Sequence, residues 1–276
     1  YALDEIVGQG KADPILKSVR SVKVLGPTIY VRFQPPANLL KDIKTAARNQ
    51  MPVSSPDVVK LYYGLIEKLA AQHSSERRVS LTEFMRPLFK LAEKRSASGD
   101  PINENRAAIL ALVLYFGDDR FERFIGDVRT AQQKSKRRRI SHIRLNGRHD
   151  FVKHFAISAG LTLTGGEKTA NTIGVLKEVK DAANKRSGFS FTDIGADRIG
   201  VRFAKKATEN RKKALEFQQV LATASSERRF FPTFTDLPQG MTTAQFQSRY
   251  RNVKSKKYKD EMAKIDRRID AIGMYR

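Results

Sequence analysis

Three short stretches between residues 149 and 200 place ionisable side chains three or four positions apart in otherwise apolar sequence. The pairs are Asp150 with His154, Glu178 with Asp181, and Asp193 with Asp197. Side chains at these spacings share one face of a helix, so the pattern predicts three helices that each present a polar pair. A buried acid is costly unless it is paired, hydrogen-bonded or bound to a metal ion. We therefore expect the chemistry of this protein where these helices meet.

Most glycoside hydrolases use a pair of carboxyl groups, and an apolar environment keeps one of the two protonated. Glu178 is the best candidate for that acid, with Asp181, Asp193 or Asp197 as its partner. His154 completes the candidate catalytic set. This interpretation predicts a hydrolase or lytic enzyme.

Two other interpretations of the same residues remain open. His154 with Asp150, Glu178 and Asp197 would offer one nitrogen and several oxygens, a ligand set suited to Zn²⁺ or Mn²⁺. A hydrolytic metal site usually has more than one histidine, and only His142 and His149 are near in the sequence. Alternatively, the polar residues form a structural hydrogen-bond network that fixes a unique core, and the protein is not an enzyme.

Glycine is unusually dense in these predicted helices. A glycine inside a helix costs about 1 kcal/mol relative to alanine, and close packing against a neighbouring helix would compensate for that cost. The pattern therefore predicts closely packed helices that bring the polar pairs together. The glycines are Gly160, Gly165, Gly166, Gly174, Gly188, Gly195 and Gly200.

The elements that must hold these residues are mostly helical. Alternating apolar residues over 21–33, interrupted by Gly26-Pro27, predict a β-hairpin, the only clear strand signal in the chain. Helical periodicity follows, first over about 37–48 and then from Pro56 onward. The stretch Glu104–Phe116 is apolar nearly all round and predicts a central buried helix. The expected fold is mainly α, a multi-helix globular bundle with one small N-terminal hairpin.

Composition divides the chain into three parts. Residues 1–128 form the hairpin and a helical scaffold, 129–148 a basic connecting loop, and 149–276 the helical part with the polar pairs and a C-terminal extension. The run RTAQQKSKRRR over 129–139 is expected to be exposed, because no nucleic-acid-binding motif accompanies it. The parts are expected to pack as one unit.

The charge balance points to an anionic partner. The chain has 52 Lys and Arg against 29 Asp and Glu, a formal net charge of +23. Such a surface favours polyanions; an anionic envelope polymer, peptidoglycan or another glycan, is the preferred partner, and nucleic acid is less favoured. No apolar run is long enough to span a bilayer.

The sequence also bears on which kinds of catalytic site are present and on where in the cell the protein is located. The absence of cysteine excludes disulfides, thiolate metal sites and cysteine nucleophiles. No Walker A loop, serine-hydrolase elbow, zincin motif or dinucleotide fingerprint is present. The chain begins with Tyr1, which we interpret as an exported protein whose signal peptide has been removed. The expected location is the periplasm or cell envelope.

Residues 149–200 also resemble a known family. The order HDFVKHFAISAG, GVLKEVKDA and GFSFTDIGADRIG is similar to the YfiM-like bacterial envelope lipoproteins and, more distantly, to the VanZ-like proteins. The resemblance implies a bacterial, envelope-facing protein, but no particular reaction. The chain departs from the family by its large N-terminal half, its C-terminal extension and its lack of the lipoprotein cysteine. The matching residues are Asp150, His154, Phe155, Lys177, Glu178, Asp181, Asp193, Asp197 and Gly200.

Together these observations predict a basic protein of the bacterial cell envelope that hydrolyses an anionic glycan or peptidoglycan. The alternative is a non-enzymatic scaffold or polyanion-binding protein.

Overall fold

The computed structural model describes residues 19–25, 28–33, 54–73, 77–136, 140–165 and 188–276. The chain divides into two compact units, Tyr1–Val53 and Ser54–Arg276. In the first unit, β1 (Val19–Leu25) and β2 (Thr28–Phe33) pair antiparallel, which confirms the predicted hairpin. The helix predicted over 37–48 lies outside the described residues.

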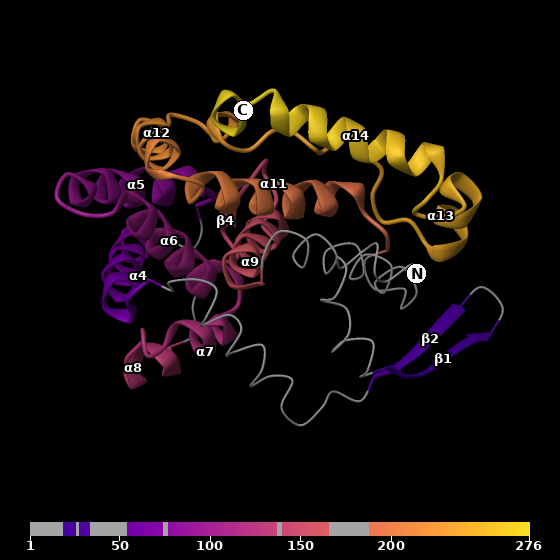
Figure 1. The fold of residues 1–276 in the computed structure, drawn as a ribbon, viewed down its shortest axis with the longest axis horizontal. Coiled ribbons are helices and arrows are strands. Elements are labelled where there is room, and N and C mark those ends of the chain that lie inside the picture. Colours follow the sequence, from indigo (N-terminus) through magenta and orange to yellow (C-terminus); the bar gives the residue numbers. More distant parts are fainter. Residues whose placement is uncertain (1–18, 26–27, 34–53, 74–76, 137–139, 166–187) are drawn as a thin grey trace. The chain divides into compact units, whose positions relative to one another are not determined.

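The second unit is built almost entirely of helices (Figure 1). The prediction of a mainly α fold is therefore confirmed. No helix in the described ranges is both long and apolar enough to cross a membrane. The longer helices are α4 (Pro56–Ala71), α5 (Thr82–Ser96), α6 (Pro101–Leu112), α9 (Asp150–Gly165), α11 (Phe191–Ala207), α12 (Arg211–Ala222), α13 (Thr243–Tyr250) and α14 (Lys256–Asp270).

Helix α6 lies at the centre of this unit, as its apolar sequence predicts. Asp100 caps its first turn by accepting hydrogen bonds from two backbone N–H groups, and Pro101 begins the helix. The helix continues into a π-helical turn over Val113–Gly117. Every residue from Ala107 to Phe116 is at most 7% exposed, so the prediction of a buried central helix is confirmed.

A charged side chain at the start of this helix is stabilised by partners from two other helices. Glu104 is only 5% exposed. The Tyr62 hydroxyl of α4 donates a hydrogen bond of 2.6 Å to its carboxylate, and Arg95 of α5 donates one of 2.9 Å. Because a buried carboxylate needs such partners, this contact ties α4, α5 and α6 together.

The segment 129–148 contains regular structure. Thr130 and Gln133 form a capping box that starts the short helix α8 (Ala131–Ser135). Strand β4 (Ile143–Arg144) then pairs in parallel with β3 (Val79–Ser80), next to α5. The side chain of Arg129 is only 7% exposed, because ion pairs hold it inside the fold. Most residues of α8 are exposed.

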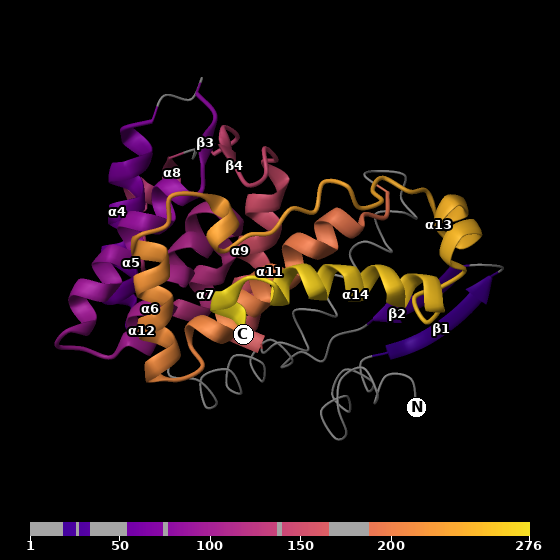
Figure 2. The ribbon, with the colours of Figure 1, turned by 90° about the horizontal axis from the view of Figure 1, so that it is seen from above.

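Helices α9 and α11 lie side by side and carry the polar residues (Figures 1 and 2). Gly200 of α11 meets the backbone of α9 so closely that a Cβ atom there would overlap the carbonyl oxygen of Phe155. A Cβ atom at Gly195 would lie 2.7 Å from the ring of Phe234. The glycines therefore permit close packing, as the sequence predicts.

Candidate functional site between helices α9 and α11

The structure brings four of the predicted site residues into one region between two helices. Asp150 and His154 lie in the first turns of α9, and Asp193 and Asp197 lie in the first turns of α11. The Ser190 side chain caps α11 by accepting a hydrogen bond from the Asp193 N–H. Both aspartates face α9, because Asp197 hydrogen-bonds with His154 and Asp193 lies 3.7 Å from the same ring. The other two predicted residues, Glu178 and Asp181, lie outside the described residues.

His154 and Asp197 form the centre of the site. The distance from His154 Nδ1 to Asp197 Oδ1 is 3.0 Å, and the Ser158 hydroxyl donates to the same oxygen at 2.8 Å. An ionised carboxylate can only accept a hydrogen bond, so this contact suits the tautomer in which Nδ1 carries the proton. The side chains of His154 and Asp197 are 12% and 8% exposed. The buried Asp197 Oδ2 has no hydrogen-bond partner among the described residues.

Arg148 bridges the remaining acids, and the sequence pattern does not reveal it. Its guanidinium donates to Asp150 and, at 2.9 Å, to Asp193. It also donates to Thr192 at 3.0 Å and to Gln239. It lies over the Phe151 ring, 4.2 Å from the centroid, where cation–π attraction adds to the ion pairs. Its position two residues before Asp150 is the one sequence feature that could have suggested this role.

The electrostatics of the outer part of the site follow from this arginine. Burial alone would raise the pKa of Asp150, but the hydrogen bonds and positive charge of Arg148 outweigh burial and lower it. The hydrogen bond to Asp150 in turn raises the pKa of Arg148. The pair is therefore ionised at neutral pH. Asp150 is 47% exposed and Arg148 26%, so solvent reaches the site along this edge.

The arrangement is suited to proton transfer. Asp197 fixes the orientation of the imidazole, and the other ring nitrogen, Nε2, lies 3.7 Å from Asp193 Oδ2, wider than a hydrogen bond. An imidazole that a carboxylate orients can accept and return a proton near neutral pH. Of the other two carboxylates, Asp193 lies beside the ring, and Arg148 pairs with both Asp193 and Asp150.

The metal interpretation gains no support from the described residues. Among them, no group of three or more histidine, aspartate or glutamate side chains is arranged to hold a metal ion. The Arg148 guanidinium supplies a positive charge between Asp150 and Asp193. Because Glu178 lies outside the described residues, the predicted set of Asp150, His154, Glu178 and Asp197 stays a prediction.

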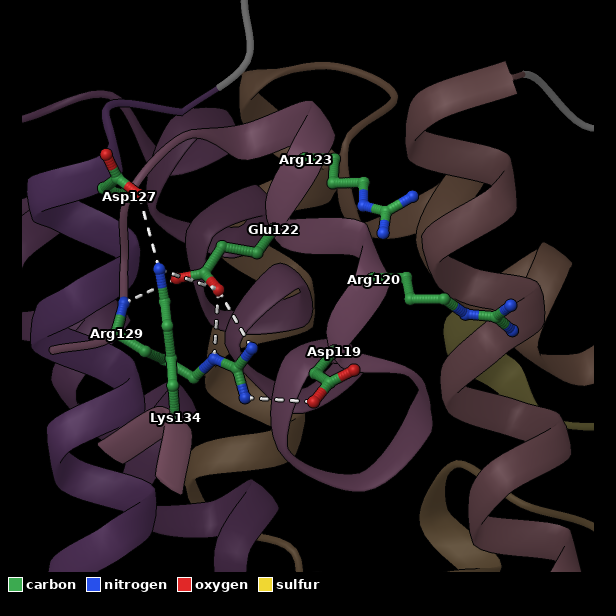
Figure 3. A pocket seen from close by; sticks show the side chains of 7 residues that line it. All are labelled: Asp119, Arg120, Glu122, Arg123, Asp127, Arg129 and Lys134. Carbon is green, nitrogen blue, oxygen red and sulfur yellow. Dashed lines mark hydrogen bonds and ion pairs between the residues drawn. The ribbon is translucent and has the colours of Figure 1, made fainter. Parts of the chain in front are cut away.

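A hollow of about 280 Å³ lies elsewhere, between the end of α7 (Glu122–Ile125) and α8 (Figure 3). It contains none of the predicted site residues. Arg129 donates hydrogen bonds to Glu122 at 2.9 Å and to Asp119 at 3.2 Å, and Lys134 lies 3.6 Å from Glu122. Because its acids and bases largely neutralise one another, we interpret this hollow as a structural ion-pair network. Its lining residues are Asp119, Arg120, Glu122, Arg123, Asp127, Arg129 and Lys134.

Comparison with known proteins adds no relative from which a function could be carried over. No protein-family model, curated protein or solved structure matches this chain. The resemblance of residues 149–200 to the YfiM-like family therefore stays a prediction.

Proposed function

We propose that this chain is a bacterial cell-envelope hydrolase that acts on an anionic glycan or on peptidoglycan. The observation that carries the proposal is the His154–Asp197 pair, joined at 3.0 Å and nearly buried, with Asp193 beside it. Apolar side chains of similar size are often at least as stabilising as a buried ion pair, so a function explains a His–Asp pair at this point more readily than packing does.

Each side chain has a role in this proposal. Asp197 holds the imidazole in one orientation, so that His154 can act as the base that takes a proton from the attacking water. The departing oxygen needs a separate acid, for which the sequence favours Glu178. Asp193 supplies a carboxylate beside the ring that can stabilise the positive charge developing on the sugar. Arg148 keeps Asp193 in place and lies at the solvent-exposed edge, where the anionic substrate would enter.

The positive charge of the chain supports an anionic polymer as the substrate. A net charge of +23 would hold the enzyme on the cell wall while it moves between bonds. Export to the periplasm is part of the same proposal, because that is where this polymer is found.

The direct test is polymer cleavage. The wild-type protein is incubated with purified sacculi and with other anionic envelope polymers, and soluble fragments are measured. We expect release by the wild type and none by His154→Gln or Asp197→Asn.

Glu178→Gln tests the acid that the sequence favours, because the amide cannot ionise or donate an acidic proton. Glu93→Gln, an exposed acid on α5, is the matched control and should cleave normally. Absence of fragments from every polymer would exclude the hydrolase.

A second candidate function is a non-enzymatic envelope scaffold or polyanion-binding protein. It is favoured by the position of Arg148, whose hydrogen bonds to Asp150, Asp193, Thr192 and Gln239 form a network of the kind that fixes a core. In this case wild-type protein binds sacculi without releasing fragments. The same two substitutions at His154 and Asp197 would then lower stability and leave binding unchanged.

A further inference from the structure

The turn between α13 and α14 concentrates positive charge. Residues 249–259, here called the basic turn, contain six basic side chains and no acid. All six are exposed. In Figures 1 and 2, α13 and the start of α14 lie at one end of the second unit, and α4, α5 and α12 lie at the other. The six residues are Arg249, Arg251, Lys254, Lys256, Lys257 and Lys259.

Little of this charge is neutralised by the residues that the structure describes. Lys256 pairs with Asp260 at 3.0 Å, but the lysine is 90% exposed and the contact is correspondingly weak. Lys254, Lys257 and Lys259 make no ion pair with a described residue. The arginines of α11, by contrast, are paired: Arg198 with Asp266 and Arg202 with Asp270 hold α14 against α11. The charge of the basic turn is therefore available to a partner.

The basic turn is held on a rigid aromatic base. Tyr250 and Tyr258 are buried and pack on Phe191, with ring centroids 5.0 Å and 5.4 Å away. Between them the chain reverses tightly at Arg251, where the Asn252 N–H donates to the Tyr250 carbonyl at 2.7 Å. The exposed side chains are thus presented from a fixed surface.

Two lysines of the basic turn also lie at the N-terminus of α14, where the helix dipole favours negative charge. The first turn of α14 contains Lys256 and Lys257 and no acid. Cations at a helix N-terminus oppose the helix dipole and cost a few tenths of a kcal/mol to about 1 kcal/mol each. An anionic surface placed against this end would offset that cost.

An exposed apolar side chain indicates what kind of anionic surface fits. Val253, in the middle of the basic turn, is 38% exposed. It is one of two large apolar side chains that are exposed in the described part of the chain; the other, Leu61, is on α4. A hydrophilic polyanion provides no apolar surroundings for this side chain, whereas the headgroup region of a bilayer borders on the acyl chains.

We propose that the basic turn docks this protein on acidic phospholipid headgroups at a bilayer surface. Lys254, Lys257 and Lys259 meet the phosphates, and Val253 enters the interface. Clusters of four to eight basic residues bind acidic membranes in this way. This membrane contact is separate from the proposed hydrolysis, since the site between α9 and α11 takes no part in it.

The first experiment measures co-sedimentation with vesicles of phosphatidylglycerol and phosphatidylcholine in equal parts, and of phosphatidylcholine alone. We expect binding to the acidic vesicles only, with release as salt is added. Lys254→Gln, Lys257→Gln and Lys259→Gln, combined in one variant, should weaken partitioning about 100-fold, from about 1 kcal/mol for each lysine. Each change is on the surface, and an unchanged melting temperature would verify folding.

A second triple variant controls for net charge. Lys60→Gln, Lys90→Gln and Lys94→Gln remove the same charge from exposed positions on α4 and α5. We expect a loss of less than about threefold, because these positions face away from the bilayer when the basic turn is docked. Equal losses in the two triple variants would overturn the proposal, as would a wild type that ignores acidic vesicles.

The second experiment distinguishes a bilayer from a dissolved polyanion. The chain contains no tryptophan, so Val253→Trp introduces a single tryptophan as a fluorescent reporter. Its emission should shift to shorter wavelength with acidic vesicles, because the ring leaves water. Duplex DNA and soluble wall polymer should produce no such shift. A different result would overturn the bilayer proposal: saturable binding to DNA or to the polymer that depends on the basic turn, together with no shift on vesicles. The partner of the basic turn would then be that polyanion.

Discussion

Asp197 receives two hydrogen bonds on one carboxylate oxygen, from His154 and Ser158, and none from the described residues on the other. This imbalance distinguishes it from Asp193, which Arg148 holds, and from Asp150, which is half exposed. Asp197 is therefore the one of these three acids with a buried oxygen that receives no hydrogen bond from the described residues. Substitutions here report on the site more directly than substitutions at the exposed edge.

We predict that Asp197→Asn lowers the free energy of unfolding by about 1–3 kcal/mol. The amide keeps an acceptor for Ser158 and His154, but it places a donor where the buried Oδ2 has no described partner. Urea unfolding of the two proteins measures the difference. Glu93→Gln should change stability by less than about 0.5 kcal/mol. Equal stability of Asp197→Asn and wild type would show that the buried Oδ2 position accommodates a donor without loss.

His142 gives a second prediction at this scale, on pH dependence. Its side chain is 7% exposed, and neither ring nitrogen has a hydrogen-bond partner among the described residues. Burial is the largest cause that lowers its pKa, and the charges of His73, Arg144 and His149 lower it further. Below the usual value of about 6.5 the unfolded chain binds a proton that the folded protein excludes, so stability falls as the pH falls.

The measurement is unfolding in urea between pH 7.5 and 5, with His142→Phe as the comparison. The variant keeps an aromatic ring but cannot be protonated, so its stability should decrease less over this range. The difference between the two curves isolates the contribution of this histidine. Parallel curves would mean that His142 titrates equally in the folded and unfolded states.

At the scale of elements, the contact between α9 and α11 determines the site. Glycine at position 200 lets the two backbones approach until a side-chain carbon would overlap the carbonyl oxygen of Phe155. The His154–Asp197 contact lies one helical turn away from it along α11. The spacing of the helices and the geometry of the polar pair therefore depend on each other.

We predict that Gly200→Ala destabilises the protein by about 1–3 kcal/mol, the usual range for overpacking a core. Backbone atoms cannot yield as a flexible side chain can, so the helices must separate. Gly64→Ala on α4 is the matched control, because a Cβ atom there has nothing within 4 Å. It should stabilise the helix by about 0.5–1 kcal/mol. Thermal unfolding of both variants measures the contrast, and a stable Gly200→Ala would show that α11 can shift freely.

For the whole molecule, the net positive charge is the property that most affects binding to anionic partners. The chain has 52 basic and 29 acidic residues, and because each ion pair uses one of each, pairing within the chain leaves the net charge of +23 unchanged. Some of the described pairs join two helices, such as Arg198 with Asp266. The surplus remains at the surface and acts at a distance set by the salt concentration.

We predict that binding to anionic polymers weakens steeply with salt and depends little on their sequence. Retention on sacculi and on duplex DNAs of different sequence, measured across a salt series, tests this. All curves should fall with added salt, and the DNA curves should coincide. Tight binding to one DNA sequence that survives high salt would contradict the envelope proposal.

Much of the fold could be predicted from the sequence because the signals are local. The hairpin, the buried central helix and the helical phase of Asp193 and Asp197 follow from the spacing of apolar residues over one or two turns. The two-residue strands β3 and β4 were not predicted, since no periodicity shows in so short a segment. Likewise, the charge of residues 129–139 predicts a loop. The capping box at Thr130 nevertheless starts the short helix α8 within this run.

The sequence by itself determined which residue types face one side of each helix and how much positive charge the surface must carry. Only the tertiary structure decided which groups are partners. Arg148 contacts Asp150 two residues away, Asp193 45 residues away and Gln239 91 residues away. His154 reaches Asp197 across 43 residues. Helix periodicity fixes directions within a helix, whereas pairing between helices depends on how closely they pack, and that distance is set by contacts remote in the chain.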